Sequence, residues 1–288
     1  MGKRSILFAL PAFIIYSALL IVPILLAFML SFTSWTGYAA NPIHYVGIAN
    51  FIDLWKDEKF LHSIWVTLRL VLVVTLGSNA LGLIFALLLN KSGKLTNVFR
   101  SVFFVPFVFS TVAVSFIWSS IISYTGVINY LLGVVGLETW QTDFIGNANH
   151  AIWSISIIEI WKTVGFNMVI YLAALQTVPA ELYEACTIDG GNARNKFRHV
   201  TLPMIVPGIS ISVLMSVINE MKQFDLVKVI TDGGPGSGTE TIAYHIISQA
   251  FGYNLLGYSS AIALVLFVAV VLVSIAHLSI TRRFEVES

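Results

Sequence analysis

The chain has 288 residues, of which 57% are hydrophobic and only 11% are charged. A water-soluble domain carries about a quarter charged residues, so this composition excludes an ordinary soluble protein and indicates a membrane protein. The formal net charge of +1 provides no basic field for nucleic acid. The single cysteine, Cys186, excludes an internal disulfide framework, and the scattered histidines provide no metal site.

Six apolar runs are long enough to cross a bilayer, which requires about 20 residues in a helix. They predict an all-α membrane protein with six transmembrane helices in one domain, residues 1–288. The first run is too long for the ~7–15-residue core of a signal peptide, so we expect a retained helix. In chain order the runs are Ile6–Phe32, Ile64–Leu89, Phe99–Ile122, Ala151–Leu175, Met204–Val229 and Gly257–Ile280.

Lysine and arginine in the connecting segments fall mostly on one side of the membrane. Only Lys56 and Lys59 lie on the other side. Because positive residues favour the cytoplasmic side, we expect both termini and the loop after the fourth run to face the cytoplasm. The residues on that side are Lys3, Arg4, Lys91, Lys94, Arg100, Arg194, Lys196, Arg198, Arg282 and Arg283.

That loop, residues 179–203, predicts two short helices joined by a turn. Pro179 can open the first helix, where its missing N–H costs nothing, and Glu181 and Glu184 then lie near the positive end of the helix dipole. Gly190 and the glycine after it stop this helix. A second short helix is expected over Ala193–Val200, and Pro203 then begins the fifth span.

One side of the first short helix carries Leu182, Ala185, Cys186 and Asp189 at helical spacing. The small residues at 185 and 186 allow another surface to approach closely. The alternative is an amphipathic loop on anionic lipid headgroups. Such a loop needs a bulky apolar face, which this segment lacks, so a docking element is favoured.

The same segment resembles the EAA loop of binding-protein-dependent ABC transporter permeases. The family pattern is Glu-Ala-Ala, three residues, Gly, nine residues, Ile, one residue, Leu-Pro. This chain has Glu184-Ala185-Cys186, Gly190, Val200 and Leu202-Pro203 at the same spacings, with conservative changes at Cys186 and Val200. Trp161–Met168, Phe224–Leu226, Thr231–Pro235 and Thr239–Thr241 are similar to segments of the carbohydrate-uptake branch.

The resemblance implies the permease architecture of a type I ABC importer, in which the EAA loop docks into a cytoplasmic ATPase subunit. The chain lacks the phosphate loop Gly-x-x-x-x-Gly-Lys-Ser/Thr, so we expect a transport subunit and not an enzyme. No cofactor is expected on this chain, and ATP and Mg²⁺ are expected in the ATPase. The implied coupling residues are Glu181, Glu184, Ala185, Cys186, Asp189, Gly190, Leu202 and Pro203.

The implied partners are a second homologous permease, two ATP-binding subunits, an extracellular solute-binding protein, a sugar substrate and membrane lipid. The implied location is the plasma (inner) membrane of a prokaryote. The function expected from the resemblance is therefore half of the translocation pathway of a sugar or oligosaccharide importer.

Polar residues inside the fourth and fifth runs are costly in a membrane and usually line a cavity or pair with one another. Glu159, Lys162 and Phe166 share a face of the fourth run. A stripe on the fifth run contains Ser212, Ser216, Asn219 and Gln223, flanked by Glu220. We expect Glu159, Lys162, Phe166, Ser216, Asn219, Glu220 and Gln223 to line the substrate pathway. The alternative is a structural ion pair with a polar stripe that joins helices.

Three other functions remain possible on the sequence. An ion-driven secondary transporter would use Glu159, Asp225 or Glu220 as an ion site and would need no ATPase. A membrane-embedded enzyme would need a cluster of acid, base or nucleophile residues that the chain does not show. A permease of the peptide or amino-acid branch is disfavoured by the Gly-Gly-Pro segment at residues 233–235.

Overall fold

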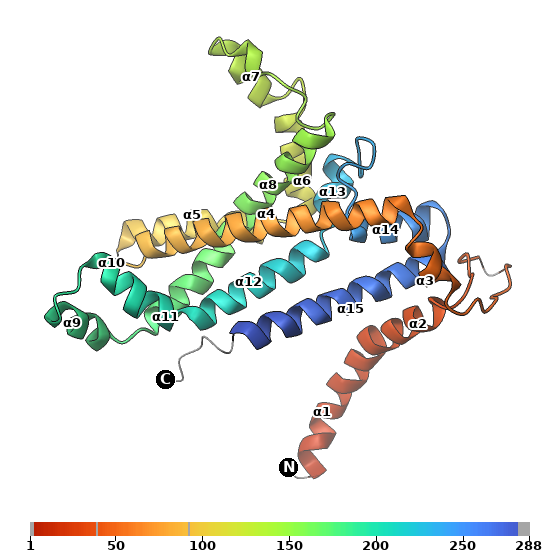
Figure 1. The fold of residues 1–288 in the computed structure, drawn as a ribbon, viewed down its shortest axis with the longest axis horizontal. Helices are drawn as coiled ribbons and strands as arrows, with labels where there is room; N and C mark the ends of the chain where they lie inside the picture. The colour runs from red at the N-terminus through yellow and green to blue at the C-terminus, as the bar shows by residue number, and fades with distance from the viewer. Residues whose placement is uncertain (1–2, 39, 92, 282–288) are drawn as a thin grey trace. The chain divides into compact units, whose positions relative to one another are not determined.

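The structure, a computed structural model, describes residues 3–38, 40–91 and 93–281 (Figure 1). These residues form helices joined by loops, with one isolated bridge between Thr33 and Tyr45, so the all-α prediction is confirmed for this part of the chain. Arg282 and Arg283, which the orientation prediction uses, lie outside the described residues. The chain separates into two compact units, residues 1–62 with 242–269 and residues 63–241 with 270–288.

The first unit begins with a long apolar rod, which is red to orange in Figure 1. It consists of α1 (Lys3–Tyr16), a π-helical turn (Ser17–Ile21) and α2 (Val22–Leu30) without an intervening loop. None of the residues in its most apolar stretch, Leu10–Leu30, is buried. The other helices of this unit are α3 (Ala49–Leu54), α14 (Ile242–Ile247), a π-helical turn (Ser248–Gly252) and the first part of α15 (Leu256–Thr281).

Asp57 sets the start of α4 (Glu58–Leu88). Its Oδ1 accepts hydrogen bonds from the backbone N–H of Lys59 at 2.9 Å and of Phe60 at 3.3 Å. These bonds satisfy donors that the start of a helix leaves without intrahelical partners. The helix therefore begins before the predicted Ile64, because a polar cap and not the apolar run determines its first turn.

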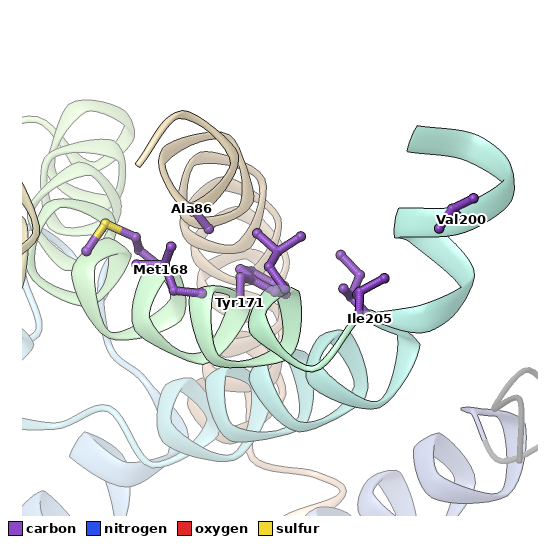
Figure 2. Packing of buried hydrophobic residues seen from close by; sticks show 8 residues of the cluster. Ala86, Met168, Tyr171, Val200 and Ile205 are labelled. Carbon is purple, nitrogen blue, oxygen red and sulfur yellow. The ribbon is translucent and has the colours of Figure 1, made fainter. Parts of the chain in front are cut away.

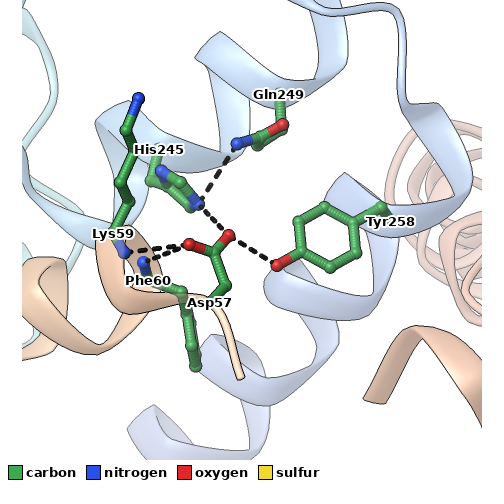
Figure 3. A network of polar contacts seen from close by, with 6 residues as sticks. All are labelled: Asp57, Lys59, Phe60, His245, Gln249 and Tyr258. Carbon is green, nitrogen blue, oxygen red and sulfur yellow. Dashed lines mark hydrogen bonds and ion pairs between the residues drawn. The ribbon is translucent and has the colours of Figure 1, made fainter. Parts of the chain in front are cut away.

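The other carboxylate oxygen of Asp57 belongs to a polar cluster of the first unit (Figure 3). The hydroxyl of Tyr258 on α15 donates to Oδ2 at 2.7 Å, and Nε2 of the buried His245 on α14 lies 3.5 Å from the same oxygen. Burial raises the pKa of Asp57, but the bonds from Tyr258, Phe60 and Lys59 and the nearby His245 outweigh it, so the pKa lies below its ordinary value. The cluster joins the start of α4 to α14 and α15.

The second unit is organised around α8, which packs along both α5 and α12, while α13 packs against α6. Most of α4 and the end of α15 also belong to it. Its remaining elements are α5 (Lys94–Val108), α6 (Thr111–Ile122), α7 (Val127–Val134), a 3-10 turn (Glu138–Trp140), α8 (Ala148–Gln176), α9 (Ala180–Ile188), α10 (Ala193–Lys196), a π-helical turn (Phe197–Thr201), α11 (Leu202–Met204), α12 (Val206–Met221) and α13 (Asp225–Ile230).

Two glycines allow helices of this unit to approach closely. A Cβ on Gly82 of α4 would lie 2.8 Å from Cβ of Asn167 and 3.1 Å from the backbone nitrogen of Met168 on α8. A Cβ on Gly165 of α8 would collide with the carbonyl oxygen of Phe103 on α5. Small residues at such positions bring helix backbones together, which is how packing holds helices in a membrane.

A hydrophobic cluster joins the segment between α8 and α12 to neighbouring helices (Figure 2). Ala86 of α4, Met168 and Tyr171 of α8, Val200 and Ile205 are all buried in it. Leu172, Leu175 and Val178 complete the set of buried members. The segment between α8 and α12 is therefore packed on its two neighbouring helices and is not a free loop.

Among the described residues, five helices are long and apolar enough to cross a membrane, and the bent pair formed by residues 193–204 and 206–221 is a sixth candidate. The predicted spans Ile64–Leu89, Ala151–Leu175 and Gly257–Ile280 correspond to α4, α8 and α15. The first predicted span corresponds to the rod of α1 and α2.

The third predicted span, a continuous helix over Phe99–Ile122, is wrong. The chain leaves the helix after Val108, because Phe109 and Ser110 have extended backbone, with ψ of 146° and 130°. A new helix begins at Thr111, and the candidate span there is Thr111–Val134. Both sides of the break are apolar, so hydropathy does not reveal it.

The fifth predicted span, Met204–Val229, is also wrong as one helix. A bend of 65° at Ile205 separates residues 193–204 from α12, and α12 ends at Met221, before the separate α13. Pro207 lies in the first turn of α12, where its missing N–H is tolerated, but it cannot bond to the carbonyl of Pro203. The helix therefore restarts after Ile205 and does not begin at Pro203.

Candidate functional site

Residues 179–203, called the elbow from here on, form the helix–turn–helix that the sequence predicts. Pro179 directly precedes α9, and Asp189 is its C-cap. Gly190 follows with φ of +78°, a conformation that favours glycine. The N–H of Gly190 bonds to the carbonyl of Thr187 at 3.0 Å, and the N–H of Gly191 to that of Cys186 at 2.8 Å. This bond pair is a Schellman motif, which ends α9 sharply.

The second half of the elbow is tied back to the first. Asn192 caps α10, because its side chain accepts a bond from the N–H of Asn195 at 2.9 Å. The hydroxyls of Tyr183 on α9 and Thr201 lie 3.0 Å apart and are hydrogen-bonded. Together with the buried Val200 and Ile205, these contacts connect the two halves of the elbow and pack it between α8 and α12.

The predicted coupling residues divide into an exposed and a half-buried group. The exposed ones are Glu181, Glu184, Ala185, Asp189 and Gly190, and the half-buried ones are Cys186, Leu202 and Pro203. Ala185, Cys186 and Asp189 line an open groove with Asn195 and His199 of the second half. Glu181, Glu184, Leu202 and Pro203 are not among the residues that line this groove.

Ile188 is an exposed elbow residue that the sequence reasoning missed. It is 86% exposed at the end of α9, although isoleucine is among the residues most often buried. The sequence signal that could have found Ile188 is its position one helical turn after Glu184. A Cβ placed on Gly190 would have no neighbouring atom within 4 Å, so the tip of the elbow is open to an approaching surface.

The predicted pathway residues lie on α8, on α12 and directly after α12. Glu159, Lys162, Ser216, Glu220 and Gln223 are buried, Phe166 is half-buried and Asn219 is exposed. Lys162 Nζ lies 3.9 Å from Glu159 Oε1. The aromatic ring of Phe166 stacks on that of Phe107 at 4.5 Å, which ties this face of α8 to α5.

Glu220 is a second buried carboxyl group, close enough to Glu159 and Lys162 to interact with both electrostatically. Glu159 Oε2 and Glu220 Oε2 are buried and have no hydrogen-bond partner. Groups of this kind are expensive at membrane depth, where they usually mark a functional pathway.

Ser216 lies in a second group, called the polar layer from here on, that joins α4, α8 and α12. Asn79 accepts bonds from the hydroxyls of Tyr171 and Ser212, both at 2.7 Å, and donates to Ser216 at 3.0 Å. Asn167 donates to Ser78 at 3.0 Å and to Ser216 at 3.4 Å. All six side chains are buried.

Sequence reasoning recognised only the serines of α12 in the polar layer. Asn79, Asn167 and Tyr171 were missed, because each is a single polar residue in a long apolar run. A periodic pattern on one helix can reveal a stripe, but it cannot show which residues of other helices meet it.

Comparisons with known proteins agree with this geometry. A family model described as the binding-protein-dependent transport system inner membrane component matches residues 78–286. The chain is 34% identical over 256 residues to the multiple sugar-binding transport system permease protein MsmF of Streptococcus mutans, covering 89% of this chain and 87% of the relative. It is 30% identical over 286 residues to the trehalose/maltose transport system permease protein MalF of Thermococcus litoralis, covering 98% and 94%.

The fold is similar to that of a chain in the crystal structure of a bacterial alginate ABC transporter in complex with an alginate pentasaccharide-bound periplasmic protein. The TM-score is 0.84 at 22% sequence identity, with 98% of this chain and 95% of that chain covered. This likeness shows that the two chains share a fold.

The chain belongs to the family of binding-protein-dependent transport system inner membrane components. Its relatives include sugar ABC transporter permeases, which confirms the predicted resemblance to the carbohydrate-uptake branch. Members of this family are transport subunits, and the apolar helices agree with a multi-pass membrane protein.

Proposed function

We propose that this chain is the transmembrane permease subunit of an ATP-driven importer for a sugar or oligosaccharide. It forms half of the translocation pathway and couples to a cytoplasmic ATPase through the elbow. It crosses the prokaryotic inner membrane six times, with α12 after the elbow as the fifth span and both termini in the cytoplasm.

The observation that carries this proposal is the construction of the elbow. It exposes Ile188, Glu184 and Gly190 at its tip while its base is packed on α4, α8 and α12. A rigid, apolar-tipped projection of this kind suits a cleft in a water-soluble partner. A displacement of the tip would be transmitted to α8 and α12, because no flexible linker separates them from it.

The partners in this assembly are a second homologous permease, two ATP-binding subunits and an extracellular solute-binding protein. This chain binds no cofactor, and ATP and Mg²⁺ are bound by the ATPase. Transport proceeds by alternating access around a site between the spans, and ATP binding and the gate are linked by a coupling free energy between distant sites.

The substrate path follows the group between α8 and α12, from Glu159, Lys162 and Phe166 to Ser216, Asn219, Glu220 and Gln223. The unpartnered oxygens of Glu159 and Glu220 support this assignment, since sugar hydroxyls donate readily to carboxylates. Phe166 offers an aromatic face for the C–H side of a sugar ring.

Charge reversal tests the elbow. In the transporter reconstituted with its partner subunits, we expect Glu184→Lys to leave the chain inserted but to abolish sugar-stimulated ATP hydrolysis and uptake. Glu138→Lys, at an exposed glutamate in the loop before α8, is the matched control and should retain both activities. Undiminished uptake by Glu184→Lys would refute the coupling assignment.

Truncation tests the pathway. We expect Asn219→Ala combined with Gln223→Ala to lower uptake by about tenfold, a loss of roughly 1.4 kcal/mol of binding to the sugar. Assembly with the ATPase, measured by co-purification, should be unchanged. An unaltered uptake rate would remove both residues from the pathway.

A second candidate function is transport driven by an ion gradient, which the two unpartnered buried carboxylate oxygens favour. Proteoliposomes containing the complete transporter distinguish the two mechanisms. Uptake that requires internal ATP and survives an uncoupler supports the importer, whereas uptake that an uncoupler abolishes at constant ATP supports the ion-driven mechanism.

A further inference from the structure

A pocket of about 290 Å³ lies between α4 and α8, away from the elbow and from the group between α8 and α12. Its polar lining includes Arg69 of α4 and Asn149 of α8. Its apolar lining includes Leu72, Ile152 and Trp153. The pocket thus combines one cationic group with an apolar floor.

Arg69 is exposed and forms no hydrogen bond or ion pair within the described part of the chain. No carboxylate lines the pocket. An arginine on a membrane-crossing helix is costly unless it reaches water, a polar headgroup or an anion. Its guanidinium is therefore available to an anionic group from outside this chain.

Arg69 lies beside the beginning of α8, because Asn149 in the first turn of that helix lines the same pocket. The beginning of a spanning helix is where headgroups are expected, although Arg69 itself lies about 16 Å along α4 from Glu58, at 1.5 Å per residue. Trp153 lies one turn further in, and tryptophan is enriched at membrane interfaces.

An apolar surface continues from the pocket toward the middle of both helices. Leu72 and Leu76 on α4 are 60% and 69% exposed, and Ile157 and Trp161 on α8 are 61% and 41% exposed. The two helices run in the same direction, since Gly77 approaches Ile160 and Gly82 approaches Asn167. The exposed stripes therefore lie side by side below the pocket.

We propose that this pocket binds an anionic phospholipid. The phosphate lies against the Arg69 guanidinium and the Asn149 amide, and an acyl chain covers Trp153 and the stripe below it. Arginine is well suited to phosphate because its donors form a planar fork. An anionic headgroup is preferred over a zwitterionic one, because no carboxylate in the pocket lining receives an ammonium group.

The test uses the assembled transporter in nanodiscs of equal parts phosphatidylglycerol and phosphatidylcholine. Native mass spectrometry after mild delipidation counts each retained lipid. We expect phosphatidylglycerol to be retained preferentially by the wild type, and Arg69→Gln to weaken that retention about fivefold. Arg69→Lys keeps the charge and should retain most of the preference. Lys56→Gln removes an exposed positive charge elsewhere and should match the wild type.

Equal retention of phosphatidylglycerol by the wild type and Arg69→Gln would overturn the proposal, as would the absence of any preference in the wild type. A photo-crosslinking residue at position 153 provides a second readout. Capture of phospholipid by this residue supports the site, whereas capture of the second permease shows that a protein covers the pocket and overturns it. Neither result depends on which sugar is transported.

Discussion

The elbow and the polar layer contain similar side chains in opposite surroundings. In the elbow the bonds of Gly190, Gly191 and Asn192 connect residues within a few positions of one another, and none of these three residues is buried. In the polar layer Asn79 connects to Tyr171 and Ser212, which are far away in the sequence, and all three are buried. The first arrangement can be read from a motif, whereas the second exists only once the helices have packed.

Polar residues of the elbow and of the polar layer therefore have different roles. Exposed polar groups of the elbow are available to a partner and contribute little to stability. Buried polar groups hold α4, α8 and α12 together, and each loses its hydrogen bonds if a partner is removed. Substitutions in the two regions should therefore affect different measurements.

The largest expected effect is on the buried charges. Lys162→Met removes the ammonium group that lies 3.9 Å from Glu159, and we expect the free energy of unfolding in detergent to fall by about 3–5 kcal/mol. Glu220→Gln keeps the size of a buried side chain whose Oε2 has no hydrogen-bond partner, so it should leave stability unchanged or slightly higher. Equal losses in both variants would show that the Glu159–Lys162 pair does not govern the stability of this group.

The next largest effect is on the polar layer. Asn79→Leu leaves the hydroxyls of Tyr171 and Ser212 without their acceptor, and we expect a loss of about 2–3 kcal/mol in thermal or denaturant unfolding. Tyr171→Phe removes one bond only and should cost about 1 kcal/mol. A negligible effect of Asn79→Leu would mean that these helices are held by apolar packing alone.

A smaller effect on stability, but a larger one on coupling, is expected in the elbow. Gly190→Val forces a β-branched residue to a φ of +78° and should cost about 1–3 kcal/mol locally. We expect sugar-stimulated ATP hydrolysis to fall while the chain remains folded. Gly136→Val is the matched control, since Gly136 has a φ of +76° and equally open surroundings in another loop. Loss of sugar-stimulated ATP hydrolysis in both variants would show that backbone strain causes the loss and that the position of Gly190 in the elbow does not.

The smallest expected effect concerns the cluster at the start of α4. The pKa of Asp57 is lower in the folded chain than in the unfolded one, so its contribution to stability is present above the unfolded pKa of about 3.9. It is lost as the pH falls through the lower folded value. Thermal unfolding measured from pH 6 to pH 3 should show this loss in the wild type and a flatter profile in Asp57→Asn. Identical profiles would contradict it.

Much of the fold could be predicted because long apolar runs have few alternatives in a membrane. The spans at α4, α8 and α15 follow from length and hydropathy. The breaks at Phe109 and Ile205 could not be predicted this way, since apolar residues continue on both sides of each break. Helix continuity there depends on backbone conformation and on what packs against the helix, and hydropathy reports neither.

The candidate site divides in the same way. The helix–turn–helix that contains Glu184 and Gly190 could be predicted from the spacing of its residues, because a helix cap and a turn are local structures. The exposure of Ile188 and the hydrogen-bond partners of Asn79 could not be predicted in this way. Both depend on which residues lie nearby in space, and the order of residues along the chain does not show this.

The sequence by itself determined the apolar composition of a membrane protein, the resemblance to the sugar permeases and the helix–turn–helix at residues 179–203. Those properties depend on composition and on short-range geometry. Only the tertiary structure decided that Asn79 joins three helices, that Glu159 and Lys162 form a buried ion pair, and that Arg69 lines an open pocket. Each of these depends on the close approach of helices distant in the chain, which glycines such as Gly82 and Gly165 permit.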